Sequence, residues 1–401
     1  MTNMFTYVEN ENSAKIKVIG VGGAGGNAIN NMIASNLQGV KFISANTDAQ
    51  ALDVSQAEVR MQLGTKITEG LGAGANPQVG RDAALENADM IKEALADSHM
   101  VFITAGFGGG TGTGAAPVIA RLCKEMGILT VAVVSRPFSF EGRKRAKQAD
   151  EGILELKKSA DTVITIPNDR LRGLASKNAK MVDMFRKADE ILLHSVKGIT
   201  DLIMMPGLVN LDFADVKTTM SRAGMAIMGI GISSGENRAL EAAERAISHP
   251  LLEDINISGA KGVLMNITSN SDLTMEEMTE ASERIYNEVG EDAEIIWGAV
   301  IDDSVGDEMS VTVIATGIGE VEKEREKEAV SRIMDPTYGG KVRDITPADL
   351  SRSPDMEKPT FIRRRQAVNE GPANEIYREY KGIVIDNDDL DVPTFLRRKA
   401  D

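Results

Sequence analysis

The chain has 401 residues, 42% of them hydrophobic, so it can build substantial cores and is not wholly disordered. Its net charge of -15 argues against non-specific binding to nucleic acid or to anionic lipid, because either surface would repel it. A single cysteine, Cys123, can form no internal disulfide, which favours a reducing cytoplasm, and no apolar run approaches the roughly 20 residues that span a bilayer.

Strands and helices are predicted to alternate through residues 14–177, after a flexible lead over residues 1–13. Strands are expected at 15–21, 41–45, 100–105, 129–135 and 162–166, and helices at 27–35, 78–96, 115–126 and 143–158. This alternation predicts a mainly parallel, doubly wound α/β sheet that binds ligands at the carboxyl ends of its strands.

One long helix is predicted within residues 178–207. Its apolar face recurs at alternating steps of four and three residues, namely Met181, Phe185, Ala188, Leu192, Ser195, Ile199 and Leu202. The helix ends at Pro206 and Gly207 and is placed to connect two domains.

Residues 208–318 are expected to form a second, smaller α+β domain, with helices at 213–223, 237–248 and 274–289 and strands at 225–232, 262–268, 295–301 and 310–316. Residues 319–386 are rich in charge and poor in apolar side chains, which predicts a disordered linker with a reach of roughly 45 Å. Residues 387–401 become apolar again. On pattern alone, this last segment fits a binding peptide and a solvated tail equally well.

The first glycine-rich segment, residues 20–26, carries G-x-G-x-x-G between a predicted strand and helix. Taken alone, this pattern is the dinucleotide fingerprint of NAD enzymes, or simply a tight turn. The acidic residue expected about 20 residues later falls late, at Asp48. An NAD(P)-dependent oxidoreductase is therefore one alternative.

A second glycine-rich segment, residues 108–114, also follows a strand and opens a helix. Glycines let successive backbone N–H groups approach an anion, the helix N-terminus adds partial positive charge, and Thr111 and Thr113 can donate hydroxyl hydrogen bonds. Two such loops on one sheet edge suit a polyphosphate. No G-x-x-x-x-G-K-[ST] occurs, so the chain is not a P-loop NTPase.

This second loop is the signature segment of the tubulin superfamily, and the chain resembles its FtsZ family of bacterial cell-division GTPases. The resemblance covers residues 14–318 and resumes at the terminal peptide. Its specific segments are GVGGAGGNA (20–28), NTDAQAL (46–52), GAGANPQVG (72–80), GGGTGTGAAP (108–117), PFSFEGRKR (137–145), TIPNDRL (165–171), FRKADEIL (185–192) and NLDFADV (210–216). Ala24 stands where many relatives have glycine, and this difference adds only a methyl group.

The resemblance implies a Rossmann-like GTPase domain of the tubulin type that binds GTP or GDP. Asn168 and Asp189 would bracket the base while Phe185 stacks on it, and a carboxylate suits guanine because it accepts from both N1–H and N2–H₂. Without the family pattern, Asp189 is equally an ordinary exposed helix acid. The implied nucleotide-binding residues are Gly22, Gly23, Ala24, Gly25, Asn27, Asp48, Gly74, Ala75, Gly108, Gly109, Gly110, Thr111, Gly112, Thr113, Glu141, Arg145, Asn168, Phe185 and Asp189.

The implied catalytic residues are Asn210, Asp212 and Asp215. Asp212 would otherwise simply cap the helix that follows it. The resemblance implies that this loop enters the nucleotide site of the next subunit, where the two acids position water and Mg²⁺ offsets phosphate charge. Such a head-to-tail contact makes a homopolymer. A filament protein that binds GTP without hydrolysing it, the other alternative, would lack the acidic pair.

The terminal peptide resembles the docking tail of the same family. The resemblance implies that membrane-tethering and regulatory division proteins bind it through Asp391, Pro393, Phe395, Leu396 and Arg397. The expected location is the cytoplasm at a mid-cell division ring, with no nucleic-acid partner and no direct membrane insertion.

Overall fold

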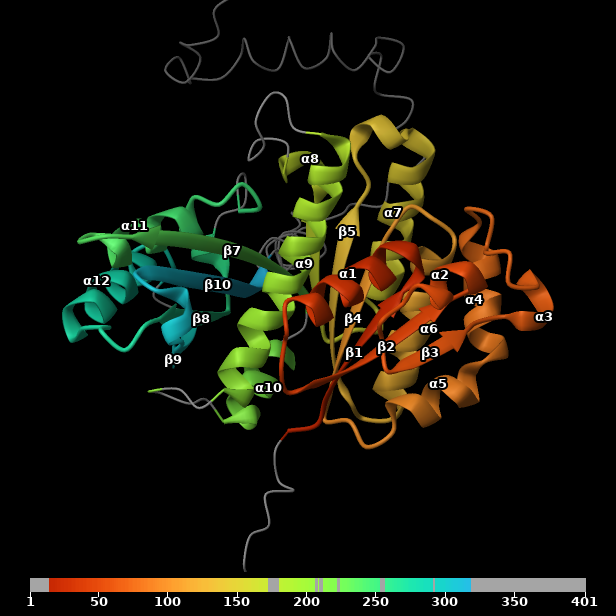
Figure 1. Cartoon of the computed structure of the whole chain (residues 1–401), viewed down its shortest axis with the longest axis horizontal. Coiled ribbons are helices and arrows are strands. Elements are labelled where there is room, and N and C mark those ends of the chain that lie inside the picture. Colours follow the sequence, from red (N-terminus) through yellow and green to blue (C-terminus); the bar gives the residue numbers. More distant parts are fainter. Residues whose placement is uncertain are drawn as a thin grey trace, which may run out of the picture. The chain divides into compact units, whose positions relative to one another are not determined.

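The computed structural model describes residues 14–171, 180–205, 208, 212–221, 224–252, 257–290 and 293–318. They build a ten-stranded sheet in the order β3-β2-β1-β4-β5-β6-β7-β10-β8-β9, with helices packed on both faces (Figure 1). The predicted α/β class with a mainly parallel sheet is confirmed. The lead, the linker and the tail peptide lie outside the described residues.

The first part of the sheet is parallel throughout. Its strands are β1 (Ile16–Val21), β2 (Val40–Asn46), β3 (Val59–Gln62), β4 (Met100–Gly106), β5 (Leu129–Arg136) and β6 (Thr162–Pro167). Its helices are α1 (Gly22–Ala34), α2 (Ala49–Asp53), α3 (Thr65–Thr68), α4 (Pro77–Glu86), α5 (Ala88–Leu95), α6 (Thr111–Glu125), α7 (Arg143–Leu156) and α8 (Asn168–Leu171). Because β1 pairs in parallel with both β2 and β4, the segments that follow these three strands meet at one end of the sheet.

The second part continues the same sheet. Its elements are α9 (Met181–Met204), α10 (Phe213–Ser221), β7 (Gly224–Ser234), α11 (Arg238–Ile247), β8 (Gly262–Ser269), α12 (Met275–Tyr286), β9 (Glu294–Ile301) and β10 (Glu308–Ile318). Strand β7 pairs in parallel with β6, and β10 lies antiparallel between β7 and β8. The sheet therefore runs unbroken across the predicted domain boundary, and the division into two domains stays a prediction.

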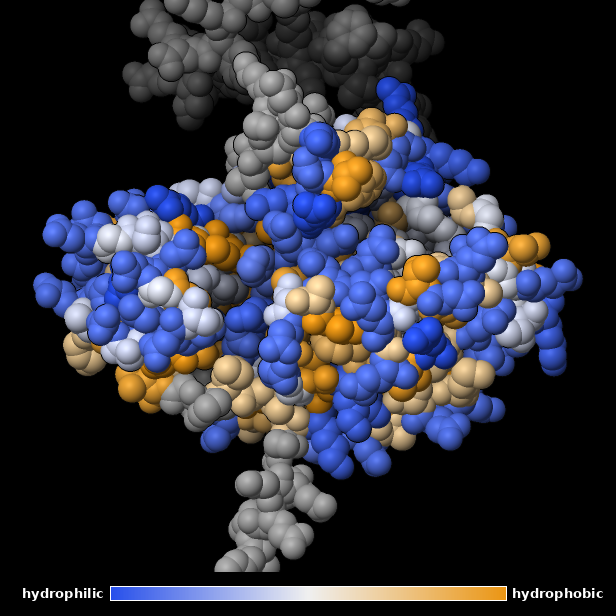
Figure 2. Space-filling view, viewed as in Figure 1, coloured by the Kyte–Doolittle hydropathy of each residue, from blue (hydrophilic) through white to orange (hydrophobic). Residues whose placement is uncertain are grey.

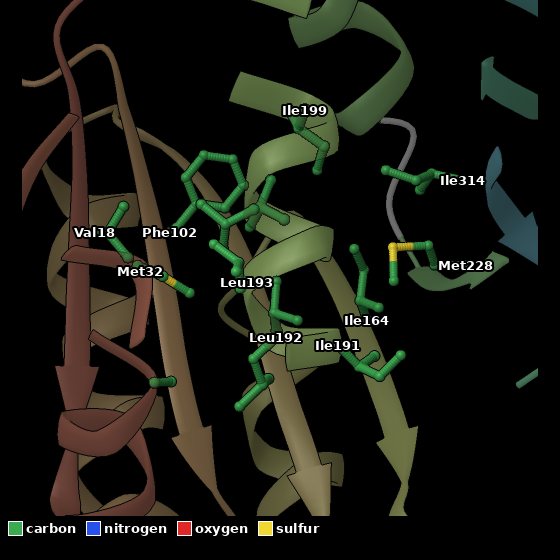
Figure 3. Packing of buried hydrophobic residues seen from close by; sticks show 14 of the residues in the cluster. Val18, Met32, Phe102, Ile164, Ile191, Leu192, Leu193, Ile199, Met228 and Ile314 are labelled. Atoms are coloured by element: carbon green, nitrogen blue, oxygen red, sulfur yellow. The ribbon is translucent and has the colours of Figure 1, made fainter. Parts of the chain in front are cut away.

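Helix α9 carries the core that joins the two parts. In Figure 3, Leu192 and Leu193 lie between Phe102 on one side and Ile164 and Met228 on the other. Five of the seven residues in the predicted apolar stripe are buried as expected, namely Ala188, Leu192, Ser195, Ile199 and Leu202. The other two, Met181 and Phe185, are 58% and 41% exposed and lie outside this core, although Met184 between them packs against it.

The element boundaries differ from the prediction mainly around glycine and asparagine. Helices α1 and α6 begin at Gly22 and Thr111, inside the glycine-rich segments, because glycine is tolerated in a first helical turn that approaches other backbone closely. The single helix expected at 78–96 is two helices, broken at Asn87, whose side-chain oxygen accepts a hydrogen bond from the Gly64 nitrogen at 2.7 Å. The short elements α2, β3 and α3 were not predicted.

Hydrophilic side chains dominate the face seen in Figure 2, and its hydrophobic side chains form small separate groups. Within the described residues, no helix is both long and apolar enough to cross a bilayer.

Candidate nucleotide-binding site

The first glycine-rich loop presents an uncapped helix N-terminus. The residue before α1 is Val21, whose side chain makes no capping hydrogen bond, and no acidic residue stands in the first turn. Gly22 has a φ of +74°, which an L side chain rarely adopts. The first backbone N–H groups of α1 therefore have no helical partner and can donate to an anion. Gly23, Ala24 and Asn27 are exposed on this helix, and Gly25 is buried.

The second glycine-rich loop has the same construction at the start of α6. Its N-cap, Gly110, also provides no side-chain hydrogen bond, and the first turn again lacks an acid. Within the loop, Gly108 has a φ of +99° and its nitrogen donates to the Thr113 hydroxyl at 2.8 Å. Thr113 is buried and shapes the loop from inside, and its expected contact with phosphate stays a prediction.

The two loops touch each other. A methyl group added at Gly22 would lie 3.0 Å from the Gly112 nitrogen and 3.3 Å from the Thr111 Cβ, so only a hydrogen fits there comfortably. Since β1 and β4 are neighbours in parallel register, α1 and α6 begin side by side at the same end of the sheet. Two helix N-termini thus face one place, which suits a group carrying several negative charges.

A third loop, residues 70–75, closes over the second. A methyl group at Gly110 would lie 2.7 Å from the Ala73 Cβ, so the two loops are in close contact. Gly74 and Ala75 are exposed beyond this contact and both have positive φ, at 56° and 58°. The resemblance implies that these two residues bind the nucleotide. The structure brings them to the same end of the sheet as the glycine-rich loops, and the contact itself stays a prediction.

Asp48 is the N-cap residue of α2. Its carboxylate caps α2 by accepting from the backbone nitrogens of Gln50 and Ala51, at 2.9 and 3.3 Å. The residue also forms a β-bridge with Leu71, at the start of the third loop. A contact of Asp48 with nucleotide stays a prediction.

Beside the glycine-rich loops lies a cavity of about 350 Å³. Its lining residues come from the ends of β5 and β6 and from the start of α7, and they are Arg136, Pro137, Ser139, Gly142, Arg143, Ala146, Pro167, Asn168 and Asp169. Asn168 is buried, and its side-chain oxygen has no hydrogen-bond partner. An unpaired buried polar atom costs about 1–3 kcal/mol, so a ligand that donates to this oxygen would gain from it.

Phe185 and Asp189 lie one turn apart on the first half of α9, where Ala188 and Ile191 pack in the core. The ring of Phe185 lies perpendicular to that of Phe138, with ring centroids 5.4 Å apart, and Phe185 is 41% exposed, so its stacking on a base stays a prediction. Burial, with a smaller contribution from the neighbouring Glu190, raises the pKa of the Asp189 carboxyl to about 6. Because burial disfavours the ionised carboxylate, a ligand that donates hydrogen bonds to it would relieve this cost.

Glu141 and Arg145 form an ion pair at 2.5 Å, four residues apart. The second carboxylate oxygen of Glu141 accepts from the Phe138 nitrogen at 2.9 Å, so Glu141 also fixes the segment that carries the aromatic residues. The Arg145 side chain is half exposed, and its contact with a nucleotide stays a prediction. A Cβ added at Gly109 would meet no other atom within 4 Å.

The acidic pair lies at the other end of the sheet. Asp212 directly precedes α10 and Asp215 lies in its first turn, and both are exposed. The next residue after Asp212, Phe213, packs against His99 with ring centroids 6.0 Å apart, and His99 directly precedes β4. The amino end of β4 is opposite to its glycine-rich loop, so these acids and the loops lie at opposite ends of one molecule (Figure 1). Asn210 lies outside the described residues.

Two residues near this site were not singled out from the sequence. Phe138 packs on Phe185, and Thr47 lies 2.6 Å from Thr111, hydroxyl oxygen to hydroxyl oxygen. Both belong to segments quoted for the resemblance, but neither has a residue type that alone signals nucleotide chemistry. The described residues contain no group of three or more His, Cys, Asp or Glu side chains that could hold a metal ion.

Taken together, two touching helix N-termini, a neighbouring cavity with an unpaired amide oxygen and a long helix crossing the sheet define a nucleotide-binding protein of the tubulin type. The model of the Tubulin/FtsZ family GTPase domain matches residues 15–176, and that of the FtsZ family C-terminal domain matches residues 224–319. The chain is 50% identical to the cell division protein FtsZ of Pseudomonas aeruginosa, over 99% of this chain and all of the relative. It is 48% identical to that of Coxiella burnetii, over 96% of each.

Solved structures agree. An FtsZ dimer of M. jannaschii superposes with a TM-score of 0.75 at 45% identity, over 78% of this chain and 90% of that one. CetZ1 from Haloferax volcanii, at 18% identity and a TM-score of 0.67 over 79% of this chain and 99% of that one, shows the same fold. The chain belongs to the FtsZ family of cell division proteins and is a GTPase. The alternative of an NAD(P)-dependent oxidoreductase is thereby set aside.

Proposed function

We propose that this GTPase hydrolyses GTP only where two copies of the chain meet head to tail, and that the resulting filaments organise the bacterial division ring. The observation that carries the proposal is the position of Asp212 and Asp215 at the end of the sheet opposite to the glycine-rich loops. One molecule cannot bring its acidic pair and its own glycine-rich loops to the same phosphate. A second molecule stacked in the same orientation can.

This arrangement also accounts for assembly. A head-to-tail contact uses two different surfaces, so each added subunit leaves one surface of each kind free. Unless the rotation closes a ring, the product is a filament. Growth and hydrolysis then become coupled, because each new contact completes one active site.

Within a completed site, the N-termini of α1 and α6, together with Thr111, hold the phosphates. Asn168, Phe185 and Asp189 hold guanine, and Glu141 and Arg145 lie toward the ribose and phosphate. Asp212 and Asp215 of the next subunit, with Asn210, position the attacking water. Mg²⁺ is expected as well, held largely by phosphate oxygens and water, which this ion keeps in nucleotide sites.

Family membership and the sequence support the proposed partners and location. The tail peptide around Phe395 and Leu396 would bind membrane-tethering and regulatory division proteins in the cytoplasm at mid-cell. These residues lie outside the described part of the chain, so the sequence pattern and the family support this element of the proposal.

The test is phosphate release from GTP and from ATP across a range of protein concentrations, with light scattering recorded on the same samples. We expect GTP-specific turnover per molecule to rise steeply above a threshold concentration, together with scattering. The Asp212→Asn variant should bind GTP normally and lose most turnover. Turnover per molecule that is independent of concentration would mean a self-contained site and would refute the shared one.

A further inference from the structure

Thr47 lies at the junction of the three loops that form the phosphate end of the site. It follows β2 directly and is fully buried. Its hydroxyl oxygen lies 2.6 Å from that of Thr111, the first residue of α6, although the two residues are 64 positions apart in the chain. Either hydroxyl can be the donor in this hydrogen bond.

The backbone of Thr47 holds the third loop. Its carbonyl oxygen accepts from the Gly72 nitrogen at 3.2 Å, and the Thr68 hydroxyl lies between this oxygen and the Gly64 carbonyl oxygen, at 3.2 and 3.0 Å. On the other side, Thr111 is in contact with the first glycine-rich loop at Gly22. Thr47 therefore touches the second loop through its side chain and the third through its main chain, and it reaches the first through Thr111.

The number of available protons decides which threonine donates in the hydrogen bond between Thr47 and Thr111. Each hydroxyl has one proton to donate, whereas an ionised phosphate only accepts. When a phosphate oxygen binds at Thr111, the Thr111 proton must point to that oxygen. The proton in the bond between the two threonines must then come from Thr47.

We propose that Thr47 is a positioning residue for the nucleotide: by donating to Thr111, it orients the Thr111 hydroxyl so that its proton faces the bound phosphate. This inference rests on the proposed phosphate site at the start of α6. Thr47 itself is buried beneath the loops and is not proposed to touch the nucleotide.

The test is equilibrium binding of GTP to the full chain in four proteins: wild type, Thr47→Val, Thr111→Val and the double variant. Valine keeps the shape of threonine and removes the hydroxyl. We expect Thr47→Val to weaken GTP binding about 3- to 10-fold, as for the loss of one hydrogen bond. In the Thr111→Val background the same change should have almost no effect, because the hydroxyl that it orients is gone. Thr47→Ser should restore most of the affinity.

A matched control separates orientation from folding. Thr130 is also fully buried in the sheet, and its hydroxyl donates to the Ile128 carbonyl oxygen far along the strand from the loops. Thr130→Val should lower the melting temperature and leave GTP affinity unchanged.

The other outcomes are equally informative. An equal loss from Thr47→Val with and without the Thr111 hydroxyl would mean a general structural role and would overturn the inference. Weakened binding in Thr111→Val but not in Thr47→Val would also overturn it, while leaving the phosphate site intact. Normal binding in all the threonine variants and in Asp189→Asn would overturn the proposed site itself.

Discussion

Asp189 shows how a residue can be poorly placed for the empty protein and well placed for its ligand. Burial, with a smaller contribution from the neighbouring Glu190, raises the pKa of its carboxyl to about 6. The ionised carboxylate is therefore disfavoured in the free chain. Asn168, which lines the cavity beside the glycine-rich loops, has a buried side-chain oxygen without a partner. Both groups are acceptors. Guanine presents donors at N1 and N2, so both costs would be reduced when it binds.

This gives a pH prediction for nucleotide binding. Guanine favours the ionised carboxylate, so GDP affinity should be full above about pH 7 and should fall as the pH drops through 6, by up to about tenfold per pH unit. GDP binding measured from pH 8 to 5 checks this. Asp189→Asn removes the titrating group: it should bind about 10- to 100-fold more weakly at pH 7.5, without the additional slope. Equal slopes in both proteins would assign the pH effect to the phosphates of GDP.

Residues of the site were predictable from sequence where the chemistry lies in a contiguous motif. The glycine-rich loops satisfy this condition, since each loop and the helix N-terminus after it are one segment of chain. Thr47 and Phe138 do not, because their contacts with Thr111 and Phe185 join distant segments and exist only after the sheet has formed. Threonine and phenylalanine are also common in cores, so their type carried no signal.

At the scale of elements, α9 decides whether the two parts of the sheet behave as one. Its residues Leu192 and Ile199 are buried in a cluster that includes side chains of β1, β4, β6, β7 and β10. Truncating such a residue leaves a cavity in a core shared by both parts. The effect should therefore appear in the stability of both parts together.

We predict that Leu192→Ala lowers the free energy of unfolding by about 2–5 kcal/mol. Val182→Ala is the matched control, because Val182 is 66% exposed on the same helix, and it should change the value by less than about 0.5 kcal/mol. Urea unfolding followed by far-ultraviolet circular dichroism measures both. A single transition that shifts as a whole is expected. Two separate transitions in the wild type, only one of which shifts in the variant, would show that α9 does not couple the two parts.

The same helix illustrates what periodicity can and cannot give. The step of four and three residues correctly predicted the buried stripe from Ala188 to Leu202. It also included Met181 and Phe185, because the pattern records which side of the helix is apolar and not where the sheet beneath it ends. The break between α4 and α5 was missed for a related reason: Asn87 bonds to Gly64, a residue distant in sequence.

For the whole molecule, the parallel strands of the first part give the folded chain a direction. The glycine-rich loops follow the carboxyl ends of β1 and β4, and α10 carries the acidic pair at the opposite end. The alternation of strands and helices predicted the position of the glycine-rich loops. The position of the acidic pair could not be derived from spacing, since it depends on α9 running along the sheet and returning the chain to the amino ends of the strands.

This direction predicts complementation between two kinds of variant. Subunits with Asp212→Asn and Asp215→Asn keep both glycine-rich loops, so they should bind GTP and join filaments, but they cannot complete the site of the neighbour that they cap. Subunits with Asp189→Asn keep the acidic pair and bind GTP weakly. At a GTP concentration that leaves Asp189→Asn largely unloaded, each variant alone should have little turnover, whereas a random equal mixture should reach about a quarter of the wild-type value, because a site is complete where an Asp189→Asn subunit caps an acid-deficient one. Sedimentation with labelled variants verifies co-assembly. Mixing Glu93→Gln, which removes an exposed acid on α5, into wild type should leave turnover unchanged. No recovery of turnover in mixtures that do co-assemble would place the whole active site within one subunit.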